Sequence, residues 1–199
     1  MARLIDETKI ERIRNTTIEM VVNKGFGGAS ISEIAKIAGV AEGYLYRYYK
    51  GKTELVDDLL FSNLNELIDK LEEFLSDLHS VRDIFEQLIR VLFKTANKYP
   101  ERVKFLFVLM HDYNFKLQDS QRKRILDLCK RIKEKGLATK EISKSIDEEE
   151  IFLLGFTYPI EFINLRFKSL FNRTVLGEKE IQRVLKVCVS AIKKENSEL

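Results

Sequence analysis

The sequence predicts an all-α protein of about nine helices, with a small N-terminal domain and a larger C-terminal domain. Apolar residues recur every three to four positions, and no segment shows the strict alternation expected of a strand. Hydrophobic residues make up 45% of the chain and charged residues 33%, with only two prolines, which is typical of a soluble, helix-rich protein. A chain of 199 residues holds one large or two small domains.

The first 52 residues are expected to form three helices. Apolar spacing predicts a helix over residues 5–24, closed by the glycine-rich turn at residues 25–28. Ser30 and Glu33 have the spacing of a capping box, which starts a second helix that ends before Gly39. A third, short helix buries Leu45 and ends at about residue 49. Two short helices joined by a tight glycine turn form a helix-turn-helix.

The rest of the chain is expected to form six longer helices. The predicted ranges are residues 52–78, 80–99, 101–115, 119–135, 147–171 and 178–194, each bounded by residues that start or stop helices. Pro159 is expected to kink or locally open the helix that contains it. We therefore divide the chain into a helix-turn-helix domain of residues 5–52 and a helical domain of residues 53–199.

The outward side of the third helix has the composition of a DNA-reading surface. Phenol hydroxyls and the Arg and Lys side chains donate to phosphates, and aromatic rings pack on thymine methyls. Gly43 has no Cβ, which lets the backbone approach a groove floor. Lys52 opens the next helix, where its charge and the first backbone amides are expected to hold one phosphate. The predicted contacts to double-stranded DNA are Ser32, Glu42, Gly43, Tyr44, Tyr46, Arg47, Tyr48 and Lys52.

The alternative for this region is a helical hairpin whose tyrosines cover a core. Tyr46 and Tyr49 fit partly into a core, but three tyrosines and an arginine cannot all face inward on so short a helix. The net charge of +3 does not by itself indicate nucleic acid, whereas four basic residues and one acidic residue lie between Lys36 and Lys52. A second basic stretch, over residues 116–144, has interleaved apolar residues and is interpreted as a solvated helix face.

The helix-turn-helix region resembles the TetR family of transcriptional regulators. The family pattern is approximately Gly-Val-Ser-x-Gly-Thr-Leu-Tyr-x-Tyr-Phe-x-Ser-Lys-x-x-Leu, and upstream Thr16, Thr17 and Lys24-Gly25-Phe26 are similar as well. The matching positions here are Gly39, Val40, Gly43, Leu45, Tyr46, Tyr48, Tyr49, Lys52 and Leu55. Ala41 stands where the family has a capping Ser or Thr, and Tyr44 where a small polar residue commonly faces bases. The resemblance implies a repressor, while beyond residue 60 it consists only of length, helicity and a pair of C-terminal helices.

Aromatic residues are unusually frequent in the C-terminal domain, which favours an apolar pocket for a small-molecule effector. Ordinary core packing is the alternative, and it is the better explanation for any one of these residues taken alone. The predicted effector-binding residues are Phe105, Met110, Tyr113, Phe156 and Phe162. We expect them to line a cavity beside the long helix of residues 52–78.

The last two helices are apolar around more of their circumference than one buried side requires. A second copy of the chain is the simplest cover, which predicts a homodimer with a four-helix interface. Its two recognition helices would read a near-palindromic operator. A fully intramolecular core is the alternative. The predicted interface residues are Ile163, Phe167, Val184, Val187, Cys188 and Ala191.

Other classes of function find no support in the sequence. Cys129 and Cys188 are too few and too far apart for a disulfide framework or a metal site, and neither histidine has metal-binding spacing, so we expect no metal and no cofactor. No phosphate loop, carboxylate pair or Cys–His arrangement indicates an enzyme. The N-terminus lacks the apolar segment of a signal peptide and the apolar runs are too short to span a bilayer, so we expect a cytoplasmic protein.

Two functional hypotheses follow. In the first, the protein is a sequence-specific DNA-binding regulator, a repressor that a small apolar or aromatic effector releases from its operator. In the second, it is a DNA-bound scaffold that recruits a protein partner through its C-terminal helices, without a small-molecule effector.

Overall fold

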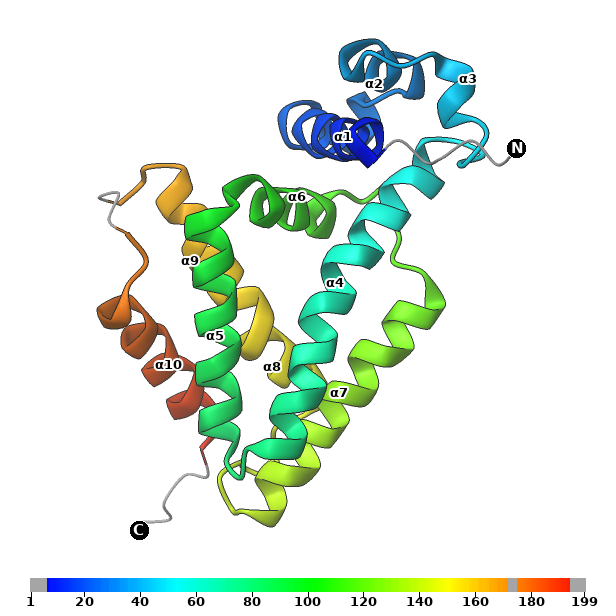
Figure 1. Cartoon of the computed structure of the whole chain (residues 1–199). Helices are drawn as coiled ribbons and strands as arrows, with labels where there is room; N and C mark the ends of the chain where they lie inside the picture. Colours follow the sequence, from blue (N-terminus) through cyan, green and yellow to red (C-terminus); the bar gives the residue numbers. More distant parts are fainter. Residues whose placement is uncertain (1–6, 172–174, 194–199) are drawn as a thin grey trace. The chain divides into compact units, whose positions relative to one another are not determined.

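The computed structural model describes residues 7–171 and 175–193, and all the regular structure in these ranges is helical (Figure 1). This confirms the predicted all-α class. None of the helices in the described ranges has the length and apolar character needed to cross a membrane. The starts and ends predicted at residues 5 and 194 lie outside the described residues.

The chain forms two compact units, each built from two stretches of sequence. The first unit comprises Met1–Asn63 and Lys104–Leu117, and the second comprises Leu64–Val103 and Gln118–Leu199. Two of the three boundaries fall inside helices, namely α4 (Lys52–Asp77) and α6 (Pro100–His111), and the third lies just before residue 119. Two helices therefore run without interruption from one unit into the other.

The first unit is built on α1 (Glu7–Gly28), α2 (Ile31–Ala38), α3 (Glu42–Leu45) and the start of α4. Its core consists of the apolar faces of these helices, including Val21, Ile34, Leu45 and Leu55, each of which is fully buried. Gly25 interrupts α1 with φ 72° and ψ 170°, a conformation that favours glycine. The residues after Gly25 therefore leave the axis of the first part of the helix.

In the second unit, α5 (Val81–Lys98) is the central helix. It contacts α7 (Asp119–Ala138), α9 (Tyr158–Phe167) and α10 (Glu178–Ile192). Apolar residues at helical spacing bury one wide face of α5, and Phe85 and Phe93 are the largest of them. Arg124 of α7 donates to Asn65, Asp69 and Glu72 of α4 at 2.7–3.2 Å, which ties these two helices together.

The segment that contains Pro159 is a composite helix, since α8 (Glu148–Phe152) passes through a π-helical turn at Leu153–Thr157 into α9. The local opening expected at Pro159 is thus confirmed. In the π-helical register the carbonyl of Leu154 would pair with the amide of Pro159, which has no N–H. The Cys188 thiol donates to that carbonyl instead, at 3.0 Å. A buried side chain of α10 therefore satisfies the group that proline leaves unpaired.

Several predicted helix ends were wrong. Helix α9 ends at Phe167 rather than near residue 171. The third helix is regular only to Leu45. After it, the backbone amides of Tyr48 and Tyr49 both donate to the Leu45 carbonyl in a tightened turn. Helix α6 ends at His111 rather than near residue 115, because the Asp112 side chain accepts from the amide of Asn114 and closes a turn there. Helix α7 continues three residues further than expected, to Ala138.

Gly136 in α7 provides a test of core packing. A Cβ at this position would overlap the side chain of Ile142 and would lie 3.0 Å from Cγ2 of Val81. We expect Gly136→Ala to lower the free energy of unfolding by about 1–3 kcal/mol, because overpacking outweighs the helix propensity of alanine. Urea unfolding followed by circular dichroism measures this change.

Gly27→Ala is the matched control, since Gly27 is also helical and no atom lies within 4 Å of its added Cβ. This variant should be neutral or more stable. Equal stability of the two variants would contradict the packing argument.

Candidate nucleic-acid interface

The turn between α2 and α3 has the geometry that its sequence predicts. The Ser30 side chain accepts from the amide of Glu33 at 3.3 Å, which caps α2. Gly39 is left-handed, with φ 69° and ψ 41°, and the amide of Val40 donates to the Ala35 carbonyl at 3.0 Å. The second hydrogen bond of a capping box, from the Ser30 amide to the Glu33 carboxylate, is not formed. The Glu33 carboxylate instead forms an ion pair with Lys24 at 2.5 Å.

Helix α3 buries Leu45 completely, and α3 together with the turn that follows it carries an aromatic and cationic cluster. The rings of Tyr44 and Tyr48 lie 5.3 Å apart, and the guanidinium of Arg47 lies 5.1 Å from the centre of the Tyr44 ring. Tyr46 and Tyr48 are 53% and 48% exposed, which is high for such large apolar rings. The cluster offers hydroxyl and guanidinium donors next to aromatic edges, which is the chemistry of groove and phosphate contacts.

Ser32 and Glu42 form a polar link between α2 and α3. The Ser32 hydroxyl donates to Oε1 of Glu42 at 2.8 Å, and both residues are exposed. Glu42 also lies in the first turn of α3, where a carboxylate interacts favourably with the helix dipole. Ala41, the N-cap residue of α3, has no hydroxyl that could cap the helix. The link between Ser32 and Glu42 is consistent with that absence. No atom lies within 4 Å of a Cβ built on Gly43, so the surface there is open.

Lys52 has a structural role that the sequence did not indicate. Its ammonium group donates to the carbonyls of Phe26 and Gly27 at 2.7 and 3.3 Å and lies 4.5 Å from the Phe26 ring centre. The start of α4 therefore holds the end of α1. The predicted contact between Lys52 and a phosphate stays a prediction. The phosphate would have to share the Lys52 ammonium group with the two carbonyls.

Asp112, immediately after α6, holds the same turn from another side. Its Oδ2 accepts from the amide of Phe26 at 3.2 Å, while its Oδ1 accepts from the amide of Asn114 at 2.9 Å. The backbone amide of Asn114 is the largest of several hydrogen bonds that lower the pKa of Asp112 below its usual value. No local sequence pattern points to Asp112, because it lies 86 positions from its partner.

A second side-chain contact joins the turn after α3 to the first turns of α4. The Tyr49 hydroxyl donates to the Asp58 carboxylate at 3.0 Å. Burial and this hydrogen bond raise the pKa of Tyr49 to about 12. Of the two tyrosines that could be partly core, Tyr49 is the half-buried one and Tyr46 is exposed.

The five predicted effector-binding residues belong to different units. Phe105, Met110 and Tyr113 lie in the first unit, whereas Phe156 and Phe162 lie in the second. Tyr113 is 98% exposed, so the expectation that it lines an enclosed cavity was wrong. Phe105 is completely buried, and Phe162 stacks on Phe93 with ring centres 5.9 Å apart. The pocket in the second unit is lined by other residues and is considered below.

The six predicted interface residues divide by exposure. Ile163, Val184 and Cys188 are fully buried within the single chain, so their apolar side chains are covered by this chain itself. Their assignment to an intermolecular surface needs correction, because α9, which carries Ile163, and α10 both pack against α5. Val187 and Ala191 of α10 are exposed and Phe167 is half-buried, so these three positions are available to a partner surface.

Comparison with known proteins identifies the family. Residues 13–59 match the model described as bacterial regulatory proteins, tetR family. The uncharacterized HTH-type transcriptional regulator YvdT of Bacillus subtilis (strain 168) is 27% identical over 146 residues, which cover 71% of this chain and 73% of YvdT.

Solved structures with the same fold cover almost the whole chain. A TetR family transcription regulator from Marinobacter aquaeolei VT8 has a TM-score of 0.76 and 20% identity, covering 94% of this chain and 96% of its own. The transcriptional regulator FadR from Bacillus subtilis, in complex with stearoyl-CoA, has a TM-score of 0.73 and 21% identity, covering 92% and 99%.

The chain belongs to the TetR family of transcriptional regulators, which confirms the resemblance of its helix-turn-helix. It is accordingly a DNA-binding transcriptional regulator and not an enzyme.

The different environments of Arg47 and Lys52 predict different effects of neutralising them. Arg47→Gln should weaken binding to all DNA sequences and reduce the slope of log K against log salt by about one unit, without changing thermal stability. Lys52→Gln should in addition destabilise the protein by about 1–2 kcal/mol, because two carbonyls lose their donor.

Fluorescence anisotropy over a salt series, together with thermal unfolding, separates the two effects. An unchanged melting temperature in Lys52→Gln would show that its contacts to α1 contribute nothing to stability.

Proposed function

We propose that the protein is a repressor that a small apolar or aromatic effector releases from a near-palindromic operator. The observation that carries the DNA-binding part is a surface cluster on a helix-turn-helix, made of the exposed Tyr46, Arg47 and Tyr48 and the half-buried Tyr44. Tyr44, half-buried beside Tyr48, is proposed to read base edges or methyl groups, while the exposed tyrosines hold phosphates. Such a regulator acts on the chromosome, so a cytoplasmic location is part of the proposal.

The nature of the effector is supported by one structural relative. FadR from Bacillus subtilis was solved with stearoyl-CoA, a ligand with a long apolar chain. The second unit of the present chain is rich in half-buried aromatic rings, and Phe152 and Phe156 lie 5.4 Å apart at the π-helical turn. π-Helical turns occur frequently at functional sites. We therefore place the effector contact on this segment, with Phe156 and Phe162.

The coupling between effector and operator is proposed to use both helices that run between the units, rather than α4 alone. Lys52 at the start of α4 and Asp112 after the end of α6 both bind the backbone of residues 26–27. A displacement of either helix would therefore change the contacts at the end of α1. An effector that prefers the displaced arrangement would weaken operator binding, and operator DNA would weaken effector binding by the same factor.

The scaffold hypothesis remains the second candidate because of an exposed apolar group near the end of α9. Leu170, Phe171 and Val175 are 67%, 56% and 79% exposed, which fits a surface for a protein partner. A thermal-shift screen of apolar compounds separates the two functions. The repressor hypothesis predicts stabilising compounds, and the scaffold hypothesis predicts none.

Asp112 should be necessary for the response but not for effector binding. In the wild type, stearoyl-CoA or a compound from the screen should weaken operator binding roughly 5- to 150-fold. In Asp112→Ala the same compound should still bind, while this factor falls towards one, because the contact with α1 is lost. Anisotropy with labelled operator and calorimetry with the compound measure both quantities.

Asp127→Ala is the control, since it removes an aspartate from the exposed face of α7 and should leave the factor unchanged. A full response in Asp112→Ala would rule out this contact as a route. An operator affinity that no compound changes in the wild type would rule out effector release altogether.

Dimerisation through α10 should depend on its exposed side rather than on its buried one. Val187 is 45% exposed, so Val187→Glu should produce folded monomers that bind operator poorly. A charge at the fully buried Val184 would disrupt the fold and does not test the interface. Leu126→Glu on α7 makes the same chemical change at a residue that is 52% exposed and serves as control. Light scattering decides the oligomeric state, and a monomeric wild type would contradict the homodimer.

A further inference from the structure

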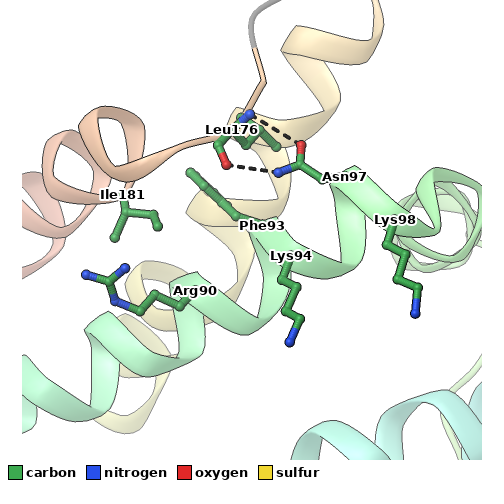
Figure 2. A pocket seen from close by; sticks show the side chains of 7 residues that line it. All are labelled: Arg90, Phe93, Lys94, Asn97, Lys98, Leu176 and Ile181. Carbon is green, nitrogen blue, oxygen red and sulfur yellow. Dashed lines mark hydrogen bonds between the residues drawn. The ribbon is translucent and has the colours of Figure 1, made fainter.

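The second unit contains a pocket of about 580 Å³ beside the outward face of α5 (Figure 2). Its walls come from α5, the start of α10 and the residue Leu176 that precedes α10. The volume falls within the range of roughly 300–1,000 Å³ that is typical of small-molecule sites. The regulator function described above assigns no role to this pocket.

The walls of the pocket are held in place by hydrogen bonds. The Asn97 side chain donates to the Leu176 carbonyl at 2.9 Å and accepts from the Leu176 amide at 3.3 Å (Figure 2). Both terminal nitrogens of Arg90 donate to the Glu178 carboxylate, at 2.6 and 2.7 Å. These two contacts fix the chain on both sides of the start of α10. A ligand would therefore meet a preformed site and lose little free energy to reorganisation.

The inner surface of the pocket is apolar. Phe93, Leu176 and Ile181 are 1%, 6% and 7% exposed and contribute its hydrocarbon lining. The Phe93 ring is backed by the parallel ring of Phe162, which prevents it from collapsing inward. This lining suits an apolar group of modest size.

The rim of the pocket carries positive charge that the protein does not neutralise. Lys94 and Lys98 are exposed, lie four residues apart on α5, and form no ion pair within residues 7–171 and 175–193. Both residues line the pocket, and Figure 2 shows their side chains leaving α5 on the side away from Leu176. The Lys98 ammonium group also lies 4.9 Å from the centre of the Tyr99 ring. Arg90 differs, because Glu86 and Glu178 already pair with it. Like charges at this spacing repel each other, and a bound anion would relieve the repulsion.

We propose that this pocket binds an amphipathic anion, with its apolar part on Phe93, Leu176 and Ile181 and its carboxylate or phosphate held by Lys94 and Lys98. The proposal concerns binding alone. It holds whether or not the ligand changes the affinity for operator DNA, so its test is independent of the repressor function.

Calorimetry on the full-length protein with octanoate, octyl phosphate, 1-octanol and acetate tests the proposal. The two amphipathic anions should bind more tightly than the neutral alcohol and than acetate, and the tighter of the two identifies the preferred head group. Lys94→Gln/Lys98→Gln should weaken the binding of octanoate roughly 2- to 30-fold, the range for two partly exposed charge contacts. Lys123→Gln/Lys130→Gln removes two charges from α7 and should have no effect.

A charge reversal gives a result that lost folding cannot imitate. Lys94→Glu/Lys98→Glu, with an unchanged circular dichroism spectrum, should lose octanoate and gain binding of octylammonium. Equal affinity of the wild type for octanoate and 1-octanol would overturn the proposal. So would octanoate binding that the two variants at Lys94 and Lys98 leave unchanged, since the ligand would then occupy another site.

Discussion

A buried backbone carbonyl or amide without a partner costs about 1–3 kcal/mol, and this cost determines how the helices of this protein are joined. Each break in a helix frees such groups. At the end of α1, after the break at Gly25, the freed groups are taken by Lys52 and Asp112. At the π-helical turn they are taken by Cys188. The breaks in local structure are therefore the places where distant segments become attached to each other.

The local half of this arrangement could be predicted from the sequence. Ser30, Gly39 and Leu45 act through neighbours within a few residues, so capping, turn geometry and burial follow from their spacing. The same holds for Pro159, whose missing N–H acts within one helical turn. The attachments themselves could not be predicted. Their partners lie 26, 34 and 86 positions away, and no local pattern indicates that Lys52 or Asp112 would bind the backbone at the end of α1.

The same limit explains the mixed result in the C-terminal half. Composition shows that α9 and α10 are apolar on more than one face, so more than one face of each helix must be covered. It does not show which segment covers each face. Val184 and Ile163 are covered within the chain, which leaves Val187 and Ala191 outside. The frequency of aromatic residues likewise predicted a pocket lined by Phe105, Met110, Tyr113, Phe156 and Phe162, but none of these residues lines the pocket of the second unit. The pocket lies where Phe93 and Ile181 meet a row of basic residues on α5, and that meeting depends on how α10 packs.

The charge distribution bears on how the proposed operator would be recognised. Four basic residues lie between Lys36 and Lys52, and Lys52 already donates to two carbonyls, so Lys36, Arg47 and Lys50 are the less committed cations. Counterion release scales with the number of neutralised phosphates, and so few cations make that sequence-independent share small. Affinity must then depend more on the tyrosine hydroxyls and rings. Those contacts require a close fit to the bases and sugars. The small number of cations, in a protein with a net charge of only +3, would therefore limit attraction to random DNA and raise specificity at the same time.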